Sequence, residues 1–146
     1  GVDPATLLYS VDSFTQGDPS IPGHLNVGMT TLQPVTINGE YTMTRGHIHA
    51  DRDAAEIYVG VEGTGLLLLD DLVGDVRVER VEPGSVHHIQ GHQAHRLVND
   101  SDAVLKVFAV WPTTAGYDYA AVEDAGGFGV RVFAGQGIIN ADSVDV

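Results

Sequence analysis

The chain contains no cysteine and a single lysine, and it has no long run of apolar residues. Without cysteine it can form neither disulfide bonds nor thiolate–metal bonds, so a metal site would have to use nitrogen and oxygen ligands. Apolar runs such as Leu66–Leu69 are strand-sized, far shorter than the roughly 20 residues that a membrane helix needs. No signal peptide is visible. We therefore expect a protein that has no membrane partner and works in the cytoplasm.

Basic residues are scarce: seven Lys and Arg stand against 20 Asp and Glu, which leaves a formal net charge of −13. This balance argues against nucleic acid as a partner, because a phosphate backbone is bound through basic patches. A small anionic substrate would still need local positive charge. A bound metal ion, Arg45, Arg96 or backbone N–H groups could each supply it.

Glycine and β-branched residues are abundant instead, and they recur with the spacing of an all-β protein. Turn sequences such as EGTG and NDSD separate the apolar segments. The expected strands lie at 25–35, 39–49, 55–63, 64–71, 75–84, 85–90, 94–100, 103–112 and 128–135. Only 113–125 and the first few residues indicate a short helix or turn. The length of 146 residues suits one domain. A small closed barrel or a two-sheet jelly roll fits best, because both suppress exposed sheet edges.

Three histidines and one glutamate have the spacing of a metal site. Side chains at i and i+2 of a strand share a face, so His47 and His49 point the same way. Glu56 shares its face with Tyr58 on the next expected strand, and His95 lies on a distant one. Three imidazoles and a carboxylate suit Fe, Mn, Ni, Co or Zn, with positions left for water or substrate. We therefore predict one divalent transition metal ion per chain, held by these three histidines and Glu56.

The same residues resemble the two sequence motifs of the cupin superfamily. The first motif matches at His47, His49, Glu56 and Gly63, and the second matches at Gly84, His95 and Asn99. Gln90 and His92 stand where the second motif has proline and glycine. The resemblance implies a single cupin jelly-roll β-barrel. We place it at 25–135, with a short N-terminal extension at 1–24 and a C-terminal tail at 136–146.

A longer gap than is common in cupins separates His49 from Glu56. This gap and three segments of the sequence make the chain similar to the cupin-type (archaeal-like) glucose-6-phosphate isomerase family over residues 25–135. The three segments are TRGHIHADRDAAEIYVGVEGTG, AHRLVND and AGYDY. The resemblance implies metal ligation as above and sugar-phosphate contacts at Thr30, Thr44, Gly46, Tyr58 and Tyr119. It also implies a homodimer and a place in glycolysis and gluconeogenesis. Tyr117 departs from the family, which has histidine there. His92 stands where the family often has tyrosine, and we predict that it lines the mouth of the site and contacts substrate.

The implied activity is the interconversion of glucose 6-phosphate and fructose 6-phosphate. A bound divalent ion would polarise the carbonyl. Glu56 is the candidate base for proton transfer between C1 and C2, and Tyr58 is a candidate hydrogen-bonding partner of the sugar. The rival route is a metal-assisted hydride shift in which Glu56 is chiefly a ligand. Two other classes stay open, because a fold does not determine a function. They are a metal-dependent cupin dioxygenase and a non-catalytic sugar-binding or regulatory cupin.

Four polar residues near the motifs have open or structural interpretations. Arg45 either lies near the barrel mouth, on the side of the metal ligands by strict alternation, or is a solvated residue at a strand end. Arg96 faces away from the metal ligands, so we expect it to form a structural salt bridge. His87 and His88 lie on opposite faces of one expected strand, so one of them should point inward.

Overall fold

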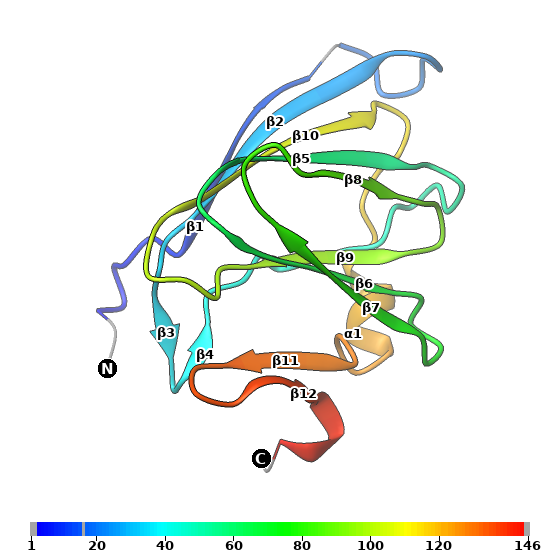
Figure 1. Ribbon diagram of the computed structural model, residues 1–146. Coiled ribbons are helices and arrows are strands. Elements are labelled where there is room, and N and C mark those ends of the chain that lie inside the picture. Colours follow the sequence, from blue (N-terminus) through cyan, green and yellow to red (C-terminus); the bar gives the residue numbers. More distant parts are fainter. Residues whose placement is uncertain (1–2, 16, 145–146) are drawn as a thin grey trace.

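The computed structural model describes residues 3–15 and 17–144, and strands dominate it (Figure 1). The strands are β1 (Tyr9–Phe14), β2 (Leu25–Leu32), β3 (Thr36–Ile37), β4 (Glu40–Tyr41), β5 (Glu56–Glu62), β6 (Gly65–Asp70), β7 (Val76–Val81), β8 (Val86–Ile89), β9 (Ala94–Val98), β10 (Leu105–Pro112), β11 (Val130–Phe133) and β12 (Gly137–Asn140). A short helix, α1 (Tyr119–Asp124), and a 3₁₀ turn, η1 (Ala141–Ser143), complete the described part. No helix within these two ranges is long and apolar enough to cross a membrane. The all-β prediction is confirmed.

A five-stranded antiparallel sheet in the order β1-β2-β10-β5-β8 forms one wall. Every second residue of β2 and β10 is buried, as expected for strands with one face on a core. The strand register places Ala109 of β10 opposite Gly28 on one side and Tyr58 on the other. Small side chains therefore lie next to Tyr58 on the inner face, and they leave room for a cavity there.

A three-stranded antiparallel sheet, β7-β6-β9, faces the first sheet across the barrel (Figure 1). The core between them includes the nearly fully buried side chains of Leu32, Leu67, Leu69, Val81, Ile89, Leu97, Leu105 and Val107. Burying one side chain of this size stabilises the fold by about 1.5–3 kcal/mol relative to exposure. The two facing sheets and their shared core are the jelly-roll barrel that the sequence predicts.

An outer layer covers β6 from the other side, so that this strand is buried on both faces. Alternate leucines of Leu66–Leu69 belong to the barrel core and to a second apolar cluster. Val132 of the outer sheet, β12-β11-β4-β3, and Val122 of α1 belong to that second cluster. The helix lies within the segment expected to be helical, and Asp118 caps it by accepting a hydrogen bond from Ala121 N–H at 3.0 Å. Burial on both faces explains the uninterrupted run of leucine.

The structure corrects the strand expected at 39–49. Regular pairing ends at Tyr41, and only isolated β-bridges follow, among them that of His47 with His95. Gly46 has a φ of 76°, in the left-handed region that glycine adopts without strain. The chain therefore turns where strict alternation of faces was assumed.

Three strands, β1, β3 and β12, lie outside the segments that were expected to form strands. β1 pairs along its whole length with β2, at the edge of the five-stranded sheet, and β12 pairs with β11. Both are largely exposed, so their sequences lack the apolar periodicity of the inner strands. The boundaries at 1–24, 25–135 and 136–146 stay a prediction.

Candidate metal centre and pocket

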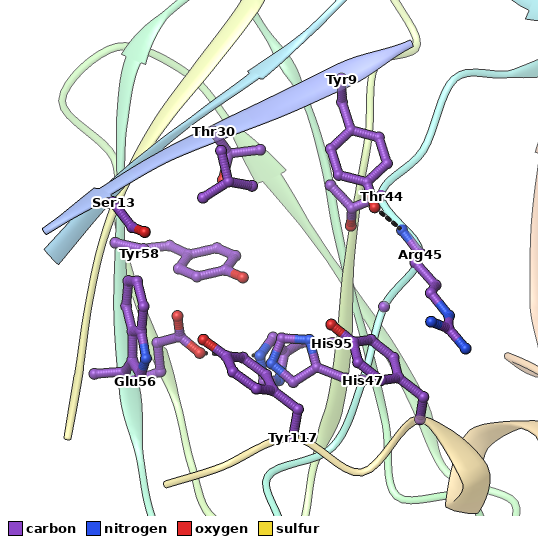
Figure 2. Close-up of a pocket in the computed structure, with 16 residues that line it drawn as sticks. Tyr9, Ser13, Thr30, Thr44, Arg45, His47, Glu56, Tyr58, His95 and Tyr117 are labelled. Atoms are coloured by element: carbon purple, nitrogen blue, oxygen red, sulfur yellow. Dashed lines mark hydrogen bonds and ion pairs between the residues drawn. The ribbon is translucent and has the colours of Figure 1, made fainter. Parts of the chain in front are cut away.

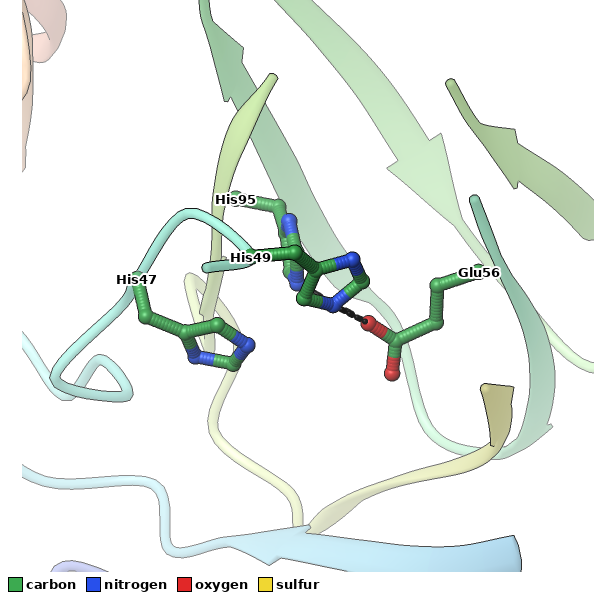
Figure 3. Close-up of side chains that lie close together, drawn as sticks. All are labelled: His47, His49, Glu56 and His95. Carbon is green, nitrogen blue, oxygen red and sulfur yellow. Dashed lines mark hydrogen bonds and ion pairs between the residues drawn. The ribbon is translucent and has the colours of Figure 1, made fainter. Parts of the chain in front are cut away.

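Four side chains converge inside the barrel (Figure 3). His47 and His49 come from the segment after β4, Glu56 opens β5, and His95 lies in β9. One possible ligand atom from each residue lies within 4.8 Å of the others. His49, Glu56 and His95 are buried, and His47 is half-buried. The structure thus brings together the four residues predicted as ligands, and this group could hold a metal ion.

Backbone carbonyl groups orient two of the imidazole rings. Nδ1 of His49 lies 3.0 Å from the Ala54 oxygen, and Nδ1 of His95 lies 3.1 Å from the Gln93 oxygen. Because a carbonyl only accepts hydrogen bonds, Nδ1 must carry the hydrogen in both rings. Nε2 of each neutral ring then directs a lone pair into the cluster, which is the arrangement found in metal-binding histidines.

One carboxylate oxygen makes the closest contacts within the cluster. Oε2 of Glu56 lies 3.0 Å from Nε2 of His49 and 3.0 Å from Nε2 of His95. The second oxygen of Glu56 points away from these two rings (Figure 3). Burial alone would raise the pKa of Glu56, but the contacts with the two imidazoles outweigh it and lower the pKa to about 2. Glu56 is therefore ionised at neutral pH and has one oxygen left for other partners.

Two of the histidines respond in opposite ways to their surroundings. Burial lowers the pKa of His47 to about 3, and repulsion from His95 adds to that effect. Burial also acts to lower the pKa of His49, but its bonds to Glu56 and to the Ala54 carbonyl outweigh burial and raise it. The buried charge of Glu56 therefore favours a proton on His49, and a cation at the cluster could take the place of that proton.

The donor atoms fit a divalent transition metal ion. Nε2 of His47 is buried without a hydrogen-bond partner, although buried polar atoms are normally paired. Three nitrogen donors and a carboxylate suit Fe, Mn, Ni, Co or Zn.

A cavity of about 360 Å³ opens onto the cluster (Figure 2). The residues that the family resemblance places on a sugar phosphate all line it: Thr30, Thr44, Gly46, Tyr58 and Tyr119. Burial, and then the charge of Glu56, raise the pKa of Tyr58 well above its usual value, so its hydroxyl keeps its hydrogen. Tyr117 also lines the cavity, with its ring edge-on to His47 at a centroid distance of 4.9 Å. The predicted substrate contacts, apart from His92, therefore share one cavity with the predicted metal ligands.

The structure places His92 elsewhere. Its side chain is largely exposed, its Nε2 lies 2.9 Å from Asp53 Oδ1, and it does not line the cavity. His92 has a φ of 63°, so the turn before His95 directs it outward. The predicted position of His92 at the mouth of the site is wrong. Of the two histidines on β8, His87 is the buried one, and it pairs with Glu79 at 2.8 Å.

Several cavity residues were not predicted from the sequence. β1 contributes Tyr9, Val11 and Ser13, which lie at every second position and so share one face. Trp111 closes another side of the cavity from β10. A Cβ on Gly28 would lie 3.1 Å from the Trp111 ring, so glycine makes room for this indole. The spacing of two positions between Tyr9, Val11 and Ser13 was the signal in the sequence that could have placed these residues on one face of a strand.

Arg96 supports the backbone beside the cluster rather than forming the expected salt bridge. Its Nε donates a hydrogen bond to the Thr44 carbonyl at 2.8 Å, and its Nη2 donates one to the Arg45 carbonyl. Its guanidinium lies 4.3 Å from the centre of the Phe128 ring. A Cβ on Gly46 would come within 2.6 Å of the same ring. Arg96 and Phe128 thus hold the turn that leads into the metal ligands.

Solved structures resemble the barrel at low sequence identity. An oxalate oxidase structure matches with a TM-score of 0.55 and 16% identity, over 67% of this chain and 47% of that one. An oxalate decarboxylase from Bacillus subtilis matches with a TM-score of 0.51 and 18% identity, over 64% of this chain and 23% of that one. At these identities the likeness concerns the fold alone. Fold and site together define the protein as a cupin whose barrel holds a cluster able to bind a metal.

Sequence comparison identifies the family within this class. A model of the glucose-6-phosphate isomerase (GPI) family matches residues 5–145. A glucose-6-phosphate isomerase of Sinorhizobium medicae is 36% identical over 127 residues, which cover 87% of this chain and 58% of that protein. One of Pyrococcus horikoshii is 38% identical over 120 residues, which cover 82% and 62%. The chain belongs to the cupin-type glucose-6-phosphate isomerase family, and it spans about three fifths of the length of these relatives.

Proposed function

We propose that the protein interconverts glucose 6-phosphate and fructose 6-phosphate with a divalent transition metal ion held by His47, His49, Glu56 and His95. One observation carries this proposal. In a chain of an isomerase family, four ligand atoms converge, and three of the residues that carry them, His47, Glu56 and His95, line a cavity of about 360 Å³. A cavity of this size is suited to a small molecule.

The proposed chemistry follows from the groups next to the cluster. When bound, the ion would polarise the substrate carbonyl and stabilise negative charge on its oxygen. Glu56 is ionised, and one of its oxygens points away from the imidazoles. That oxygen is the proposed base that moves hydrogen between C1 and C2 as a proton. Tyr58 keeps its phenolic hydrogen and is the proposed donor to a sugar oxygen.

The proposed substrate contacts lie beyond the metal ligands. Thr44 Oγ1 accepts a hydrogen bond from Leu97 N–H at 3.1 Å, so its own hydrogen is available to a ligand. Thr30 lines the same cavity from β2 (Figure 2). With the backbone of Gly46 and the ring of Tyr119, these groups form the proposed binding surface for the sugar phosphate.

A coupled assay with fructose 6-phosphate tests the function directly. Activity should disappear on chelation and return when single metals are added back. His95→Gln should lose both metal and turnover, because a buried ligand nitrogen is removed. His88→Gln changes an exposed histidine of β8 and is the matched control. A metal-loaded protein that converts neither sugar phosphate would refute the proposal.

Isotope exchange tests the role of Glu56. If Glu56 transfers a proton, fructose 6-phosphate turned over in heavy water should yield product with deuterium at C2. A metal-assisted hydride shift predicts no solvent deuterium at that position. Glu56 would then act chiefly as a ligand.

We also propose that the protein is a homodimer. β1 is an edge strand, and Val11 and Phe14 on it are exposed, as is Leu25 at the start of the neighbouring strand. Exposed edges with apolar side chains favour association. Light scattering on the purified protein tests this, and a monomer at micromolar concentration would contradict it.

A further inference from the structure

Arg45 is the only side chain with permanent positive charge among the described residues that line the cavity. The chain as a whole carries a formal charge of −13. An anionic ligand is therefore repelled by most of the surface and is attracted mainly where a cation focuses the field. In the view of Figure 2, Arg45 and Glu56 lie on opposite sides of the cavity.

The guanidinium of Arg45 is paired with an exposed carboxylate. Its Nη2 lies 3.0 Å from Oε1 of Glu123, and the two side chains are 58% and 69% exposed. Such exposed ion pairs are weak, because water and salt screen them and both side chains lose freedom. A phosphate group carries more negative charge than a carboxylate and offers several oxygens to a guanidinium, so it is a stronger partner.

Tyr119 and Tyr9 keep Arg45 at the cavity whether or not Glu123 is bound to it. The guanidinium carbon of Arg45 lies 4.0 Å from the centre of the Tyr119 ring, within the range of a cation–π contact. The backbone N–H of Arg45 donates a hydrogen bond to the Tyr9 hydroxyl at 3.2 Å. Both tyrosines line the cavity. Release of Glu123 would therefore leave a positioned cation at the cavity.

We propose that Arg45 binds the phosphate group of the substrate and that Glu123 occupies Arg45 until the phosphate displaces it. This inference rests on the proposed function, and it identifies Arg45 as the positively charged side chain that binds the phosphate of the substrate. It gives the sugar phosphate a direction, with the phosphate at Arg45 and the reacting carbons toward Glu56. Because the contact forms equally in the ground and transition states, its loss should raise KM more than it lowers kcat.

Binding of inorganic phosphate to the metal-loaded protein tests the inference without turnover. Trp111 is the single tryptophan of the chain and lines the cavity, so its fluorescence can report binding. Titration calorimetry gives the dissociation constant independently. Arg45→Gln should weaken phosphate binding about tenfold to a hundredfold, since it removes charge-assisted hydrogen bonds. Arg45→Lys, which keeps the charge, should recover part of the affinity. Thermal unfolding of each variant checks that it is folded.

Glu123→Gln gives the sharper outcome. It should strengthen phosphate binding about twofold to fivefold, because it removes the competing anion of a weak exposed pair. In an Arg45→Gln background the same change should have no effect. Glu62→Gln is the matched control, because Glu62 forms a similar exposed pair with Lys106 at 3.2 Å and does not line the cavity.

Two results would overturn the inference. One is an Arg45→Gln protein that binds phosphate as tightly as the unchanged protein. The other is a Glu123→Gln effect that persists without Arg45. Failure of the proposed function looks different: phosphate binds in an Arg45-dependent way, yet neither sugar phosphate is converted.

Discussion

Replacing Gly46 by alanine tests why the turn next to His47 contains glycine. A φ of 76° costs a residue with a Cβ about 1–2 kcal/mol. The new Cβ would also lie 2.6 Å from a ring carbon of Phe128 and 3.2 Å from the Cβ of Arg96. Forced repacking of this kind costs about 1–3 kcal/mol. Together these effects predict that Gly46→Ala lowers the free energy of unfolding by about 2–5 kcal/mol.

Gly84→Ala is the matched control, because it separates the two causes. Gly84 has a φ of 87°, but no heavy atom would lie within 4 Å of an added Cβ. This variant should lose only the conformational part, about 1–2 kcal/mol. Urea unfolding followed by circular dichroism measures both losses. For a chain of this size, each kcal/mol corresponds to roughly 2–4 °C in Tm.

Metal content adds a second measurement to the same pair of variants. Displacement of the Gly46 turn moves His47, so Gly46→Ala should retain less metal per chain, whereas Gly84→Ala should retain it fully. Equal losses of stability in the two variants would refute the argument that Phe128 and Arg96 restrict this position. A Gly46→Ala protein with unchanged stability and metal content would refute both parts.

Three further predictions concern the cluster and the barrel. At a free metal concentration 100 times the Kd, bound metal should raise the free energy of unfolding by about 2.7 kcal/mol, and a chelator should remove this stabilisation. Calorimetry measures the difference. In the chelated protein, the raised pKa of His49 means that its pair with Glu56 stabilises the fold at low pH. That contribution should be lost as pH rises through the folded-state pKa of His49, above 6.5, and unfolding curves at several pH values test it. Asn99→Ala should cost about 1–3 kcal/mol in urea unfolding, because the buried carbonyl of Leu32 loses the Asn99 amide as a donor.

The residues of the candidate metal cluster could be predicted because their signals are local. His47 and His49 are two positions apart, Glu56 opens a strand with alternating burial, and His95 lies in a short, mostly buried strand. His92 could not be placed in this way. Its φ of 63° belongs to a turn, and the direction of a side chain in a turn depends on backbone conformation rather than on spacing.

The family and the barrel also followed from the sequence, but the outer parts of the cavity did not. β1 and the turn at Gly46 are positioned by pairing with distant segments, and such pairing depends on strand register. The same is true of Trp111, whose inward direction matters only because β10 lies between β2 and β5.

The sequence by itself determined the all-β class, the residues of the candidate metal cluster and the family, because these depend on residue types at short, regular spacings. Only the tertiary structure decided which side chains share the cavity with the metal ligands. It brings Arg45 to Glu123, 78 positions away, and adds Tyr9 and Trp111 to the cavity wall. Contacts of this kind depend on how whole sheets pack around one core, and no local pattern in the chain specifies them.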